Sequence, residues 1–295
     1  MSLTINHQTN DISATSGSVT LDGNAVGGGA DLYAANESSP TAQPSATGAN
    51  AIAIGDSAIC TATRSVALGK SRVDGVESFA ALIGDNSTSY GATGGSQSVA
   101  IGQYSKSGGN SIAIGSAFTI SQGAQSVAIG RNVTSVAVGS LAMGYYVKAN
   151  IIGQFAYGYG KFAAQGDAQS GQYILRSDTT NGNAEAMTTN NATAAATNQI
   201  VAASDTCITF SGTVVAMQNG AQAYGSWEIR GLLVNDGGTT TVPNSSITAI
   251  NNASSWGLAL SADNTNNALK VQVTGEASHN IRWVANIQTS EVTYS

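Results

Sequence analysis

The stretch Gln97–Gly115, QSVAIGQYSKSGGNSIAIG, contains one short apolar unit twice, and this unit determines the fold class. The unit, Ser-(Val/Ile)-Ala-Ile-Gly, alternates β-branched with small residues, as strands do, and ends on a glycine that can adopt the positive φ of a sharp bend. Related units occupy AIAIG (51–55), SVALG (65–69), AALIG (80–84), SVAIG (98–102), SIAIG (111–115), SVAIG (126–130) and SVAVG (135–139), with weaker copies in LAMG (141–144), NIIG (150–153) and FAYG (155–158).

The spacing of the units indicates a solenoid. From Gly55 to Gly130 the closing glycines are 14, 15, 18, 13 and 15 residues apart. A period near fourteen is too short for helical-hairpin or leucine-rich repeats, and it predicts a β-solenoid whose turn consists of two short strands and two bends. Two departures, the step of 18 before Gly102 and a step of 9 after Gly130, predict irregular turns at DNSTSYGATGGSQ (85–97) and after Arg131.

Alternation within one unit predicts which side chains fill the coil. We expect Val99 and Ile101 to point inward, and Ser98, Ala100 and Gly102 to form an outer face that another backbone can approach closely. One turn buries too little apolar surface to offset the ordering of its backbone, so stability must come from stacked turns. Because so thin a coil has little interior, we expect the small outer face to pack against sister chains in an oligomer.

The composition favours strands and excludes several classes of protein. Only 9% of the 295 residues are charged, 35 are Gly, 3 are Pro, and the net charge is −6. This composition suits short strands joined by tight turns, and an acidic chain lacks the basic face of a nucleic-acid binder. We expect no signal peptide in MSLTINHQTNDISATSG and no membrane span. Cys60 and Cys207 are expected to be buried, reduced thiols of a protein made in the cytosol.

The sequence divides into four regions. Residues 1–48 are expected to be an N-terminal attachment segment and linker, 49–169 the repeats, 170–205 a polar neck or linker, and 206–295 a C-terminal tip domain. The neck is expected to contain a short helical turn around Asn183–Met187. The last region alternates as antiparallel strands do, in TCITFSGTVVAMQ and YGSWEIRGLLV for example, which predicts a β-sandwich or jelly roll.

The repeats and the C-terminal strands resemble two kinds of known protein. The region 50–165, with SVAIG twice verbatim, resembles the head of YadA-like trimeric adhesins, and this implies a homotrimeric left-handed parallel β-roll. The segments SGTVVAMQ, YGSWEIRGLLV and ALKVQVTGEASHNIRWVANIQTSEV resemble the distal β domain of tail-fibre proteins from tailed phages, notably marine ones. YadA-like repeats also occur in phage fibres, so the two resemblances agree.

Histidines and cysteines do not predict a site. His7 lies near a terminus and His279 lies in the turn GEASHN, where neither has an obvious nucleophile to activate. Two histidines and two cysteines at such spacings also make no plausible zinc site. The sequence therefore predicts no catalytic residue, metal or cofactor.

Acidic residues offer two further candidates. Asp74 and Glu77 form the densest acidic pair and could in principle cleave a polysaccharide, although a solvated loop between two turns explains them more simply. Asp263, Thr265 and Asn267 in ADNTNNAL faintly resemble a calcium loop. This loop lacks the closing Glu, so we expect a hairpin turn there.

Aromatic residues fall into two groups. Trp227, Trp256 and Trp283 each alternate with aliphatic residues and are expected in the core. Six others crowd where the repeat decays, and we expect them to cap the open end of the solenoid, with glycan binding as the alternative. These six are Tyr145, Tyr146, Phe155, Tyr157, Tyr159 and Phe162.

Receptor contacts are expected in a loop at the end of the C-terminal domain, where recognition usually occurs. The best loop is NDGGTTTVPNSS (235–246), and two tyrosines of the decaying repeat are added to it. The predicted receptor-binding residues are Asn235, Asp236, Thr239, Thr240, Asn244, Tyr157 and Tyr159.

The sequence thus predicts an all-β, homotrimeric tail fibre of a tailed phage, a structural protein of the virion that is not an enzyme. Its partners would be two sister chains, other tail or fibre proteins bound through the N-terminal segment, and a host surface glycan or protein. Nucleic acid and membrane are not expected as partners. The alternatives are a bacterial trimeric adhesin-like surface protein and a tailspike that depolymerises polysaccharide.

Overall fold

A computed structural model describes residues 42–220, 223–252 and 256–294, together with the backbone of four short N-terminal strands. These strands form two antiparallel pairs, β1 (Leu3–Asn6) with β2 (Asp11–Ala14) and β3 (Val19–Leu21) with β4 (Asn24–Val26). Most of the predicted attachment segment, including His7, lies outside the described residues. The described residues form strands, turns and no helix, so none of them could cross a membrane as a helix. The all-β prediction is confirmed.

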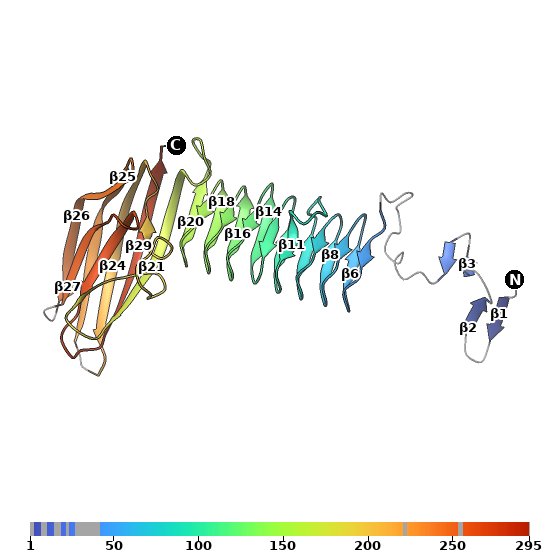
Figure 1. Cartoon of the computed structure of the whole chain (residues 1–295), viewed down its shortest axis with the longest axis horizontal. Coiled ribbons are helices and arrows are strands. Elements are labelled where there is room, and N and C mark those ends of the chain that lie inside the picture. The colour runs from blue at the N-terminus through green and yellow to red at the C-terminus, as the bar shows by residue number, and fades with distance from the viewer. Residues whose placement is uncertain are drawn as a thin grey trace.

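The repeat region is a parallel β-solenoid of about eight turns (Figure 1). Each turn contributes one strand to each of two parallel sheets. The first solenoid sheet contains β6 (Ile52–Ile54), β8 (Val66–Leu68), β10 (Phe79–Ala81), β12 (Val99–Ile101), β14 (Ile112–Ser116), β16 (Val127–Arg131), β18 (Leu141–Tyr145) and β20 (Phe155–Tyr159). The second contains β5 (Ser45–Ala46), β7 (Ile59–Cys60), β9 (Arg72–Val73), β11 (Gly91–Gly94), β13 (Lys106–Gly108), β15 (Ile120–Ser121), β17 (Thr134–Ser135) and β19 (Lys148–Ala149).

The interior of the solenoid is filled by small residues, which reverses our prediction. Ala100 and Ser98 are fully buried, whereas Val99 and Ile101 are half-buried on the outward face. The same holds along the first solenoid sheet, where the central alanine of strand after strand has no exposed surface. The error has a physical cause: a period of two separates two faces without saying which is inside, and a coil of so few residues has room only for small ones.

The bend predicted at the closing glycine is present, and a second bend lies opposite it. Gly102 has a φ of 98°, and a Cβ atom added there would lie 1.7 Å from the carbonyl oxygen of Gly115 in the next turn. The opposite bend precedes each strand of the first sheet by two residues and also needs a positive φ. It is occupied in successive turns by Asn50, Arg64, Glu77, Gln97, Asn110, Gln125, Gly139 and Gly153.

One of the two predicted irregular turns is present. Phe79 pairs with Val99, so this turn is twenty residues long and holds an extra loop around 85–89. The step after Arg131 is regular, because Val127 pairs with Leu141. The unit SVAVG (135–139) is therefore not a strand of the first sheet; its Ser135 belongs to β17.

The C-terminal half continues the first solenoid sheet. Strand β21 (Ala168–Thr179) pairs antiparallel with β20, and the order continues as β21-β29-β24-β25-β26. The remaining strands of this large sheet are β24 (Thr206–Gln218), β25 (Tyr224–Asp236), β26 (Thr239–Asn252) and β29 (Ile281–Thr293). Strands expected at TCITFSGTVVAMQ and YGSWEIRGLLV are confirmed.

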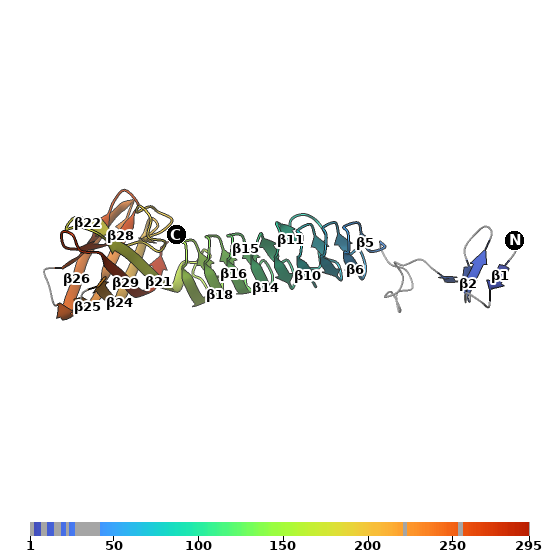
Figure 2. The same cartoon turned by 90° about the horizontal axis from the view of Figure 1, so that it is seen from below.

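A smaller sheet covers one face of the large sheet (Figure 2). It consists of β22 (Ala184–Ala186), β23 (Ile200–Val201), β27 (Gly257–Asp263) and β28 (Ala268–Thr274). The core between the sheets contains the three tryptophans, as predicted: the ring of Trp283 lies 5.5 Å from that of Trp227 and 5.6 Å from that of Trp256.

Part of the predicted neck belongs to this domain. Strand β21 crosses the large sheet between β20 and β29, so residues 170–179 join the solenoid to the C-terminal domain by a continuous sheet. The helical turn expected at Asn183–Met187 is wrong, because residues 184–186 form β22 and pair with β28.

Candidate functional site

The outward face of the first solenoid sheet carries two columns of apolar side chains along the whole solenoid. The first column is Ile52, Val66, Phe79, Val99, Ile112, Val127, Leu141 and Phe155; the second is Ile54, Leu68, Ala81, Ile101, Ile114, Ile129, Met143 and Tyr157. We call these two columns the aliphatic face. Neither column contains a charged residue, and Ile112, Ile114 and Ile129 are each 38% exposed. A contiguous exposed apolar surface of this extent marks an interaction site.

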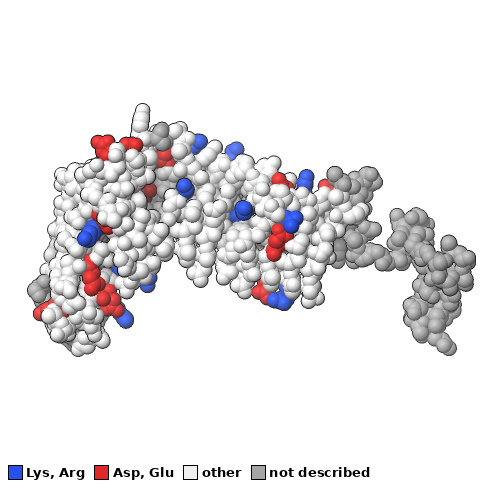
Figure 3. Space-filling model, viewed as in Figure 1, with Lys and Arg blue, Asp and Glu red and all other residues white. Residues whose placement is uncertain are grey.

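The outward face of the second solenoid sheet is different in character. In register along it lie Ser45, Ile59 and Arg72, then Gly91 of β11, and then Lys106, Ile120, Thr134 and Lys148. Three of these eight residues are basic and two carry hydroxyl groups, so this column suits contact with water better than the aliphatic columns do, although Ile59 and Ile120 are apolar. Charged side chains are few on the side of the molecule seen in Figure 3, where most of the solenoid surface is neither acidic nor basic. The two sheets therefore assign one apolar face and one solvated face to the solenoid.

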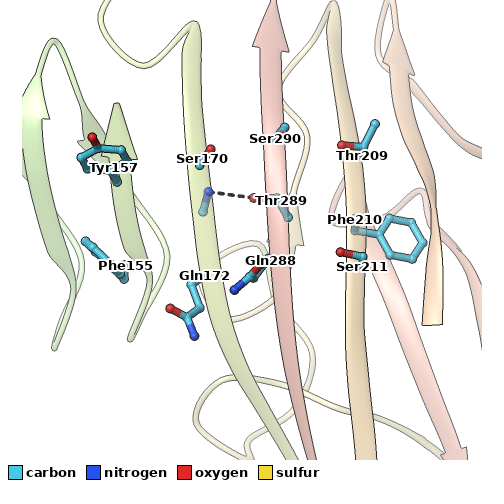
Figure 4. A pocket seen from close by; sticks show the side chains of 11 residues that line it. Phe155, Tyr157, Ser170, Gln172, Thr209, Phe210, Ser211, Gln288, Thr289 and Ser290 are labelled. Atoms are coloured by element: carbon cyan, nitrogen blue, oxygen red, sulfur yellow. Dashed lines mark hydrogen bonds between the residues drawn. The ribbon is translucent and has the colours of Figure 1, made fainter. Parts of the chain in front are cut away.

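A groove of about 530 Å³ lies where the aliphatic face meets the large sheet. Phe155 and Tyr157 of β20 border it on one side. Hydroxyl and amide side chains from β21, β29 and β24 continue it, as Figure 4 shows. These are Ser170, Gln172, Gln288, Ser290, Thr209 and Ser211. Because β20 and β21 are paired, the groove belongs to the same sheet face as the aliphatic columns.

The predicted receptor-binding loop is a tight hairpin. Strands β25 and β26 are joined through Gly237 and Gly238 alone, and Asn235 pairs with Thr240. Both of these side chains are buried at 1% exposure. The Asn235 amide donates to the carbonyl of Ala202 at 2.8 Å, so it holds the hairpin in place.

The other predicted hairpin residues remain accessible. Asp236, Thr239 and Asn244 are exposed. The backbone N–H of Thr240 donates to Asn264 Oδ1 at 2.9 Å, which ties this hairpin to the turn between β27 and β28. That turn is built on Asp263, whose carboxylate accepts hydrogen bonds from the Asn266 side chain and from backbone N–H groups of its own turn. Burial acts to raise the pKa of this carboxyl group, but the hydrogen bonds together lower it. The hairpin-turn interpretation of ADNTNNAL is confirmed.

Tyr157 and Tyr159 lie apart from the hairpin. Their rings are 54% and 88% exposed on β20, and three strands, β21, β29 and β24, separate β20 from β25. The expectation that the aromatic cluster caps the open end of the solenoid is wrong. Strand β21 closes that end by pairing with β20, while Tyr157, Tyr159 and Phe162 remain exposed.

The acidic pair of the repeats is engaged in ion pairs. Asp74 binds Arg72 Nε at 2.7 Å and accepts a hydrogen bond from Thr61 at 2.6 Å. Glu77 pairs with Arg64, and hydrogen bonds from Arg64 and Gln97 lower the pKa of its carboxyl group. These contacts fit the structural interpretation of a loop between turns.

The remaining candidates also have local partners. His279 lies 3.1 Å from Glu276 in its turn. Cys60 is buried, which raises the pKa of its thiol, and Cys207 is half-buried; both are free. Among the described residues, no three His, Cys, Asp or Glu side chains are grouped as metal ligands.

The aliphatic face was missed by sequence reasoning, although a signal for it exists. The residue between the two columns is alanine in all eight strands of the first sheet, whereas the column residues on either side of it vary among apolar residues, mostly aliphatic and aromatic. A position restricted to one small side chain indicates the crowded interior, and the variable positions indicate the outside.

No family model and no curated protein matches the sequence. Two solved structures that match are tailspikes. One is tailspike protein gp49 of Acinetobacter baumannii bacteriophage Fri1, a capsular polysaccharide depolymerase, with 10% identity and a TM-score of 0.27 over 80% of this chain and 46% of that chain. The other is the tailspike protein of Acinetobacter baumannii phage AM24, with 8% identity and a TM-score of 0.23 over 83% and 54%. The chain spans about half the length of each.

This comparison corrects one expectation. The Fri1 protein is a depolymerase and therefore an enzyme, which contradicts our expectation that this chain is not one, and we withdraw that expectation.

Proposed function

We propose that three copies of the chain pack through their aliphatic faces into a rigid tail fibre or spike of a tailed phage, which holds the C-terminal domain against the host cell surface. The observation that carries the proposal is the aliphatic face itself. Eight strands at the usual spacing give it a length of roughly 34 Å. Its two columns contain no charged residue, and Arg131 of β16 lies in the next column of that sheet, while the outward face of the other solenoid sheet carries Arg72, Lys106 and Lys148.

A three-fold arrangement would bury the apolar face of each solenoid and leave its polar face exposed to water. Three copies around one axis would bury the aliphatic columns together and leave the second solenoid sheets in water, which yields the hydrophobic free energy that the thin interior of one chain cannot supply. The resemblance of the repeats to trimeric adhesin heads supports the number three. The small Ala and Ser side chains do not take part in the association, since they fill the solenoid.

The phage assignment rests on the C-terminal domain. Its strands resemble those of tail-fibre tips, and a continuous sheet joins it rigidly to the solenoid. Three tips on one axis would bind a host surface with avidity, so weak contacts from each tip suffice. The N-terminal segment would attach the fibre to the virion or to another tail protein.

The test uses the full chain. Light scattering is expected to give three times the 29.6 kDa mass of one chain, and a pull-down with host cells should retain the trimer. A monomer, or a trimer that binds no bacterial surface, would contradict the proposal. Incubation with purified surface polysaccharide, followed by measurement of new reducing ends, reports in the same experiment whether the bound glycan is cleaved. Localisation on the virion instead of a bacterial outer membrane separates the proposal from the adhesin-like alternative.

A further inference from the structure

The two edges of the aliphatic face carry matched side chains. We number the turns by the strands β6 to β20 of the first solenoid sheet. The leading edge is the third residue before the first column of each turn, and the trailing edge is the first non-glycine residue after the second column. From the first turn to the eighth, the leading edge consists of Ala49, Thr63, Val76, Ser96, Gly109, Ala124, Val138 and Ile152, and the trailing edge of Asp56, Lys70, Leu82, Gln103, Ser116, Arg131, Tyr145 and Tyr159. Large apolar residues occur on each edge only in the third, seventh and eighth turns.

These apolar edge residues are open to solvent in one chain. Val76 and Leu82, at the two ends of the third turn, are 36% and 71% exposed, and Val138 in the seventh turn is 47% exposed. Leu82 occupies the position that is glycine in each of the other seven turns, with a φ of 58°. A leucine is uncommon and costly in this conformation, which points to a contact that offsets the cost. Phe118, exposed just beyond the trailing edge of the fifth turn, instead stacks on Tyr104 of its own chain at 5.3 Å.

We propose that the leading edge of one copy packs against the trailing edge of the next copy at the same turn. The inference rests on the proposed trimer and assigns its seams. The strands of the first solenoid sheet are parallel and in register, so all of them cross the solenoid in one direction (Figure 1). When three such faces surround one axis, the end of each strand meets the start of the corresponding strand in the next copy. A closed ring of this kind allows no shift along the axis, so both ends belong to the same turn.

The seventh and eighth turns offer the largest apolar contact. On the trailing edge, the rings of Tyr145 and Tyr159 lie 5.6 Å apart. On the leading edge, Val138 and Ile152 belong to neighbouring turns that are joined by the hydrogen bond from the Gly153 N–H to the Val138 carbonyl at 3.0 Å. Each edge therefore presents a short apolar ridge at the same height. Packing the aliphatic ridge of one copy on the tyrosine rings of the next would remove both from water.

The charged residues of the two edges do not oppose these seams. Arg64, beside the leading edge of the second turn, forms an ion pair with Glu77 beside that of the third. On the other side, the trailing residue Lys70 interacts electrostatically with Asp85. Each edge thus holds one positive and one negative charge in these two turns. The charged trailing residues of the first and sixth turns meet leading-edge residues that carry no charge.

The experiment is disulfide cross-linking of the full chain. One variant carries Val138→Cys with Tyr145→Cys, and a second carries Val76→Cys with Leu82→Cys. Within one chain the two ends of a turn are roughly 20 Å apart along the strand, whereas a disulfide joins Cα atoms less than about 7 Å apart. Only two copies can therefore be linked. A mild oxidant should convert most of the protein to dimers and trimers on a denaturing gel, and a reductant should restore the single chain.

A mismatched pair of cysteines is the control. Val76→Cys with Tyr145→Cys places one thiol on each edge but four turns apart, about 19 Å at the usual strand spacing, so this variant should remain a single chain on the gel. All variants also carry Cys207→Ser, because Cys207 is half-buried, whereas Cys60 has no exposed surface.

The outcomes separate this inference from the proposed function. Light scattering first gives the mass of the wild type and of each reduced variant. If the wild type is a trimer but neither matched pair forms a link, or if the mismatched pair links equally well, the seam assignment is wrong and the proposed trimer stands. If the wild type is a monomer, the proposed function itself fails. Should one matched pair prevent trimer formation before oxidation, the other matched pair decides.

Discussion

The hydroxyl group of Tyr173 donates a hydrogen bond to Glu291 Oε1 across 3.1 Å, between β21 and β29. The same hydroxyl accepts a hydrogen bond of 2.8 Å from Gln154, at the bend before the last solenoid strand. Gln154 stands where most earlier units have serine. Its Oε1 accepts from the backbone N–H groups of Asn150 and Ile151. This chain of contacts fixes the last turn of the solenoid to the C-terminal sheet.

Tyr173→Phe should destabilise the junction. The substitution leaves the buried Gln154 amide without its acceptor and removes a donor from Glu291, which costs about 1–3 kcal/mol of the free energy of unfolding. Calorimetry should show a lower Tm. Tyr294→Phe, at a residue that is 90% exposed just after β29, is the control and should unfold as the wild type does. Equal Tm values for the two variants would show that the contact contributes nothing.

The same tyrosine predicts a dependence on alkaline pH. Burial, reinforced by the adjacent Glu291 carboxylate, raises the pKa of Tyr173 well above its usual value. The folded state therefore favours the neutral phenol. Its contribution to stability is complete below the unfolded pKa of about 10 and is lost as pH rises through the higher folded pKa. Between pH 9 and 11 the wild type should lose more stability than Tyr173→Phe, in which the other tyrosines still titrate.

Alanine substitutions at two glycines should distinguish the free-energy cost of a positive φ from the cost of steric overlap with the next turn. Gly102 has a φ of 98° and its added Cβ would overlap the Gly115 oxygen; Gly69 has a φ of 65° and nothing within 4 Å. Gly102→Ala should cost about 3 kcal/mol or more, and Gly69→Ala about 1 kcal/mol, the cost of the positive φ alone. Urea unfolding of both variants measures the difference. Similar losses would mean that the stacked turns relax to admit a methyl group.

The sequence predicts the repeat, the bends and most strands, because each depends on local spacing. It does not predict which face is inside, since alternation is symmetrical: Val99 and Ala100 could exchange roles without changing the pattern. Strand β21 was assigned in part to a neck because polar residues follow it, and its partners β20 and β29 are settled only by the tertiary structure. In the C-terminal domain, the segments 191–194 and 263–266 line one groove although they are about seventy residues apart in the sequence, and a local pattern cannot predict such a long-range contact.

The interior should reject larger side chains. Ala113 has no exposed surface between the two solenoid sheets, and overpacking of a tight core costs about 1–3 kcal/mol. Ala113→Leu should lower the Tm, whereas Ile114→Leu, at the next residue but on the outward face, should change it little. If both were tolerated equally, the assignment of inner and outer faces would be wrong.

The aliphatic face and the opposite face should respond differently to one added charge. Ile114 lies in the second aliphatic column, and Ile120 lies on the second solenoid sheet in register with Lys106. Ile114→Lys would place an ammonium group in each of three buried contacts, which is costly without a partner, so light scattering should show dissociation or aggregation. Ile120→Lys extends a column that already holds lysines, so this variant should remain trimeric. A trimer in both variants would refute association through the aliphatic face, and dissociation of Ile120→Lys alone would move the interface to the second sheet.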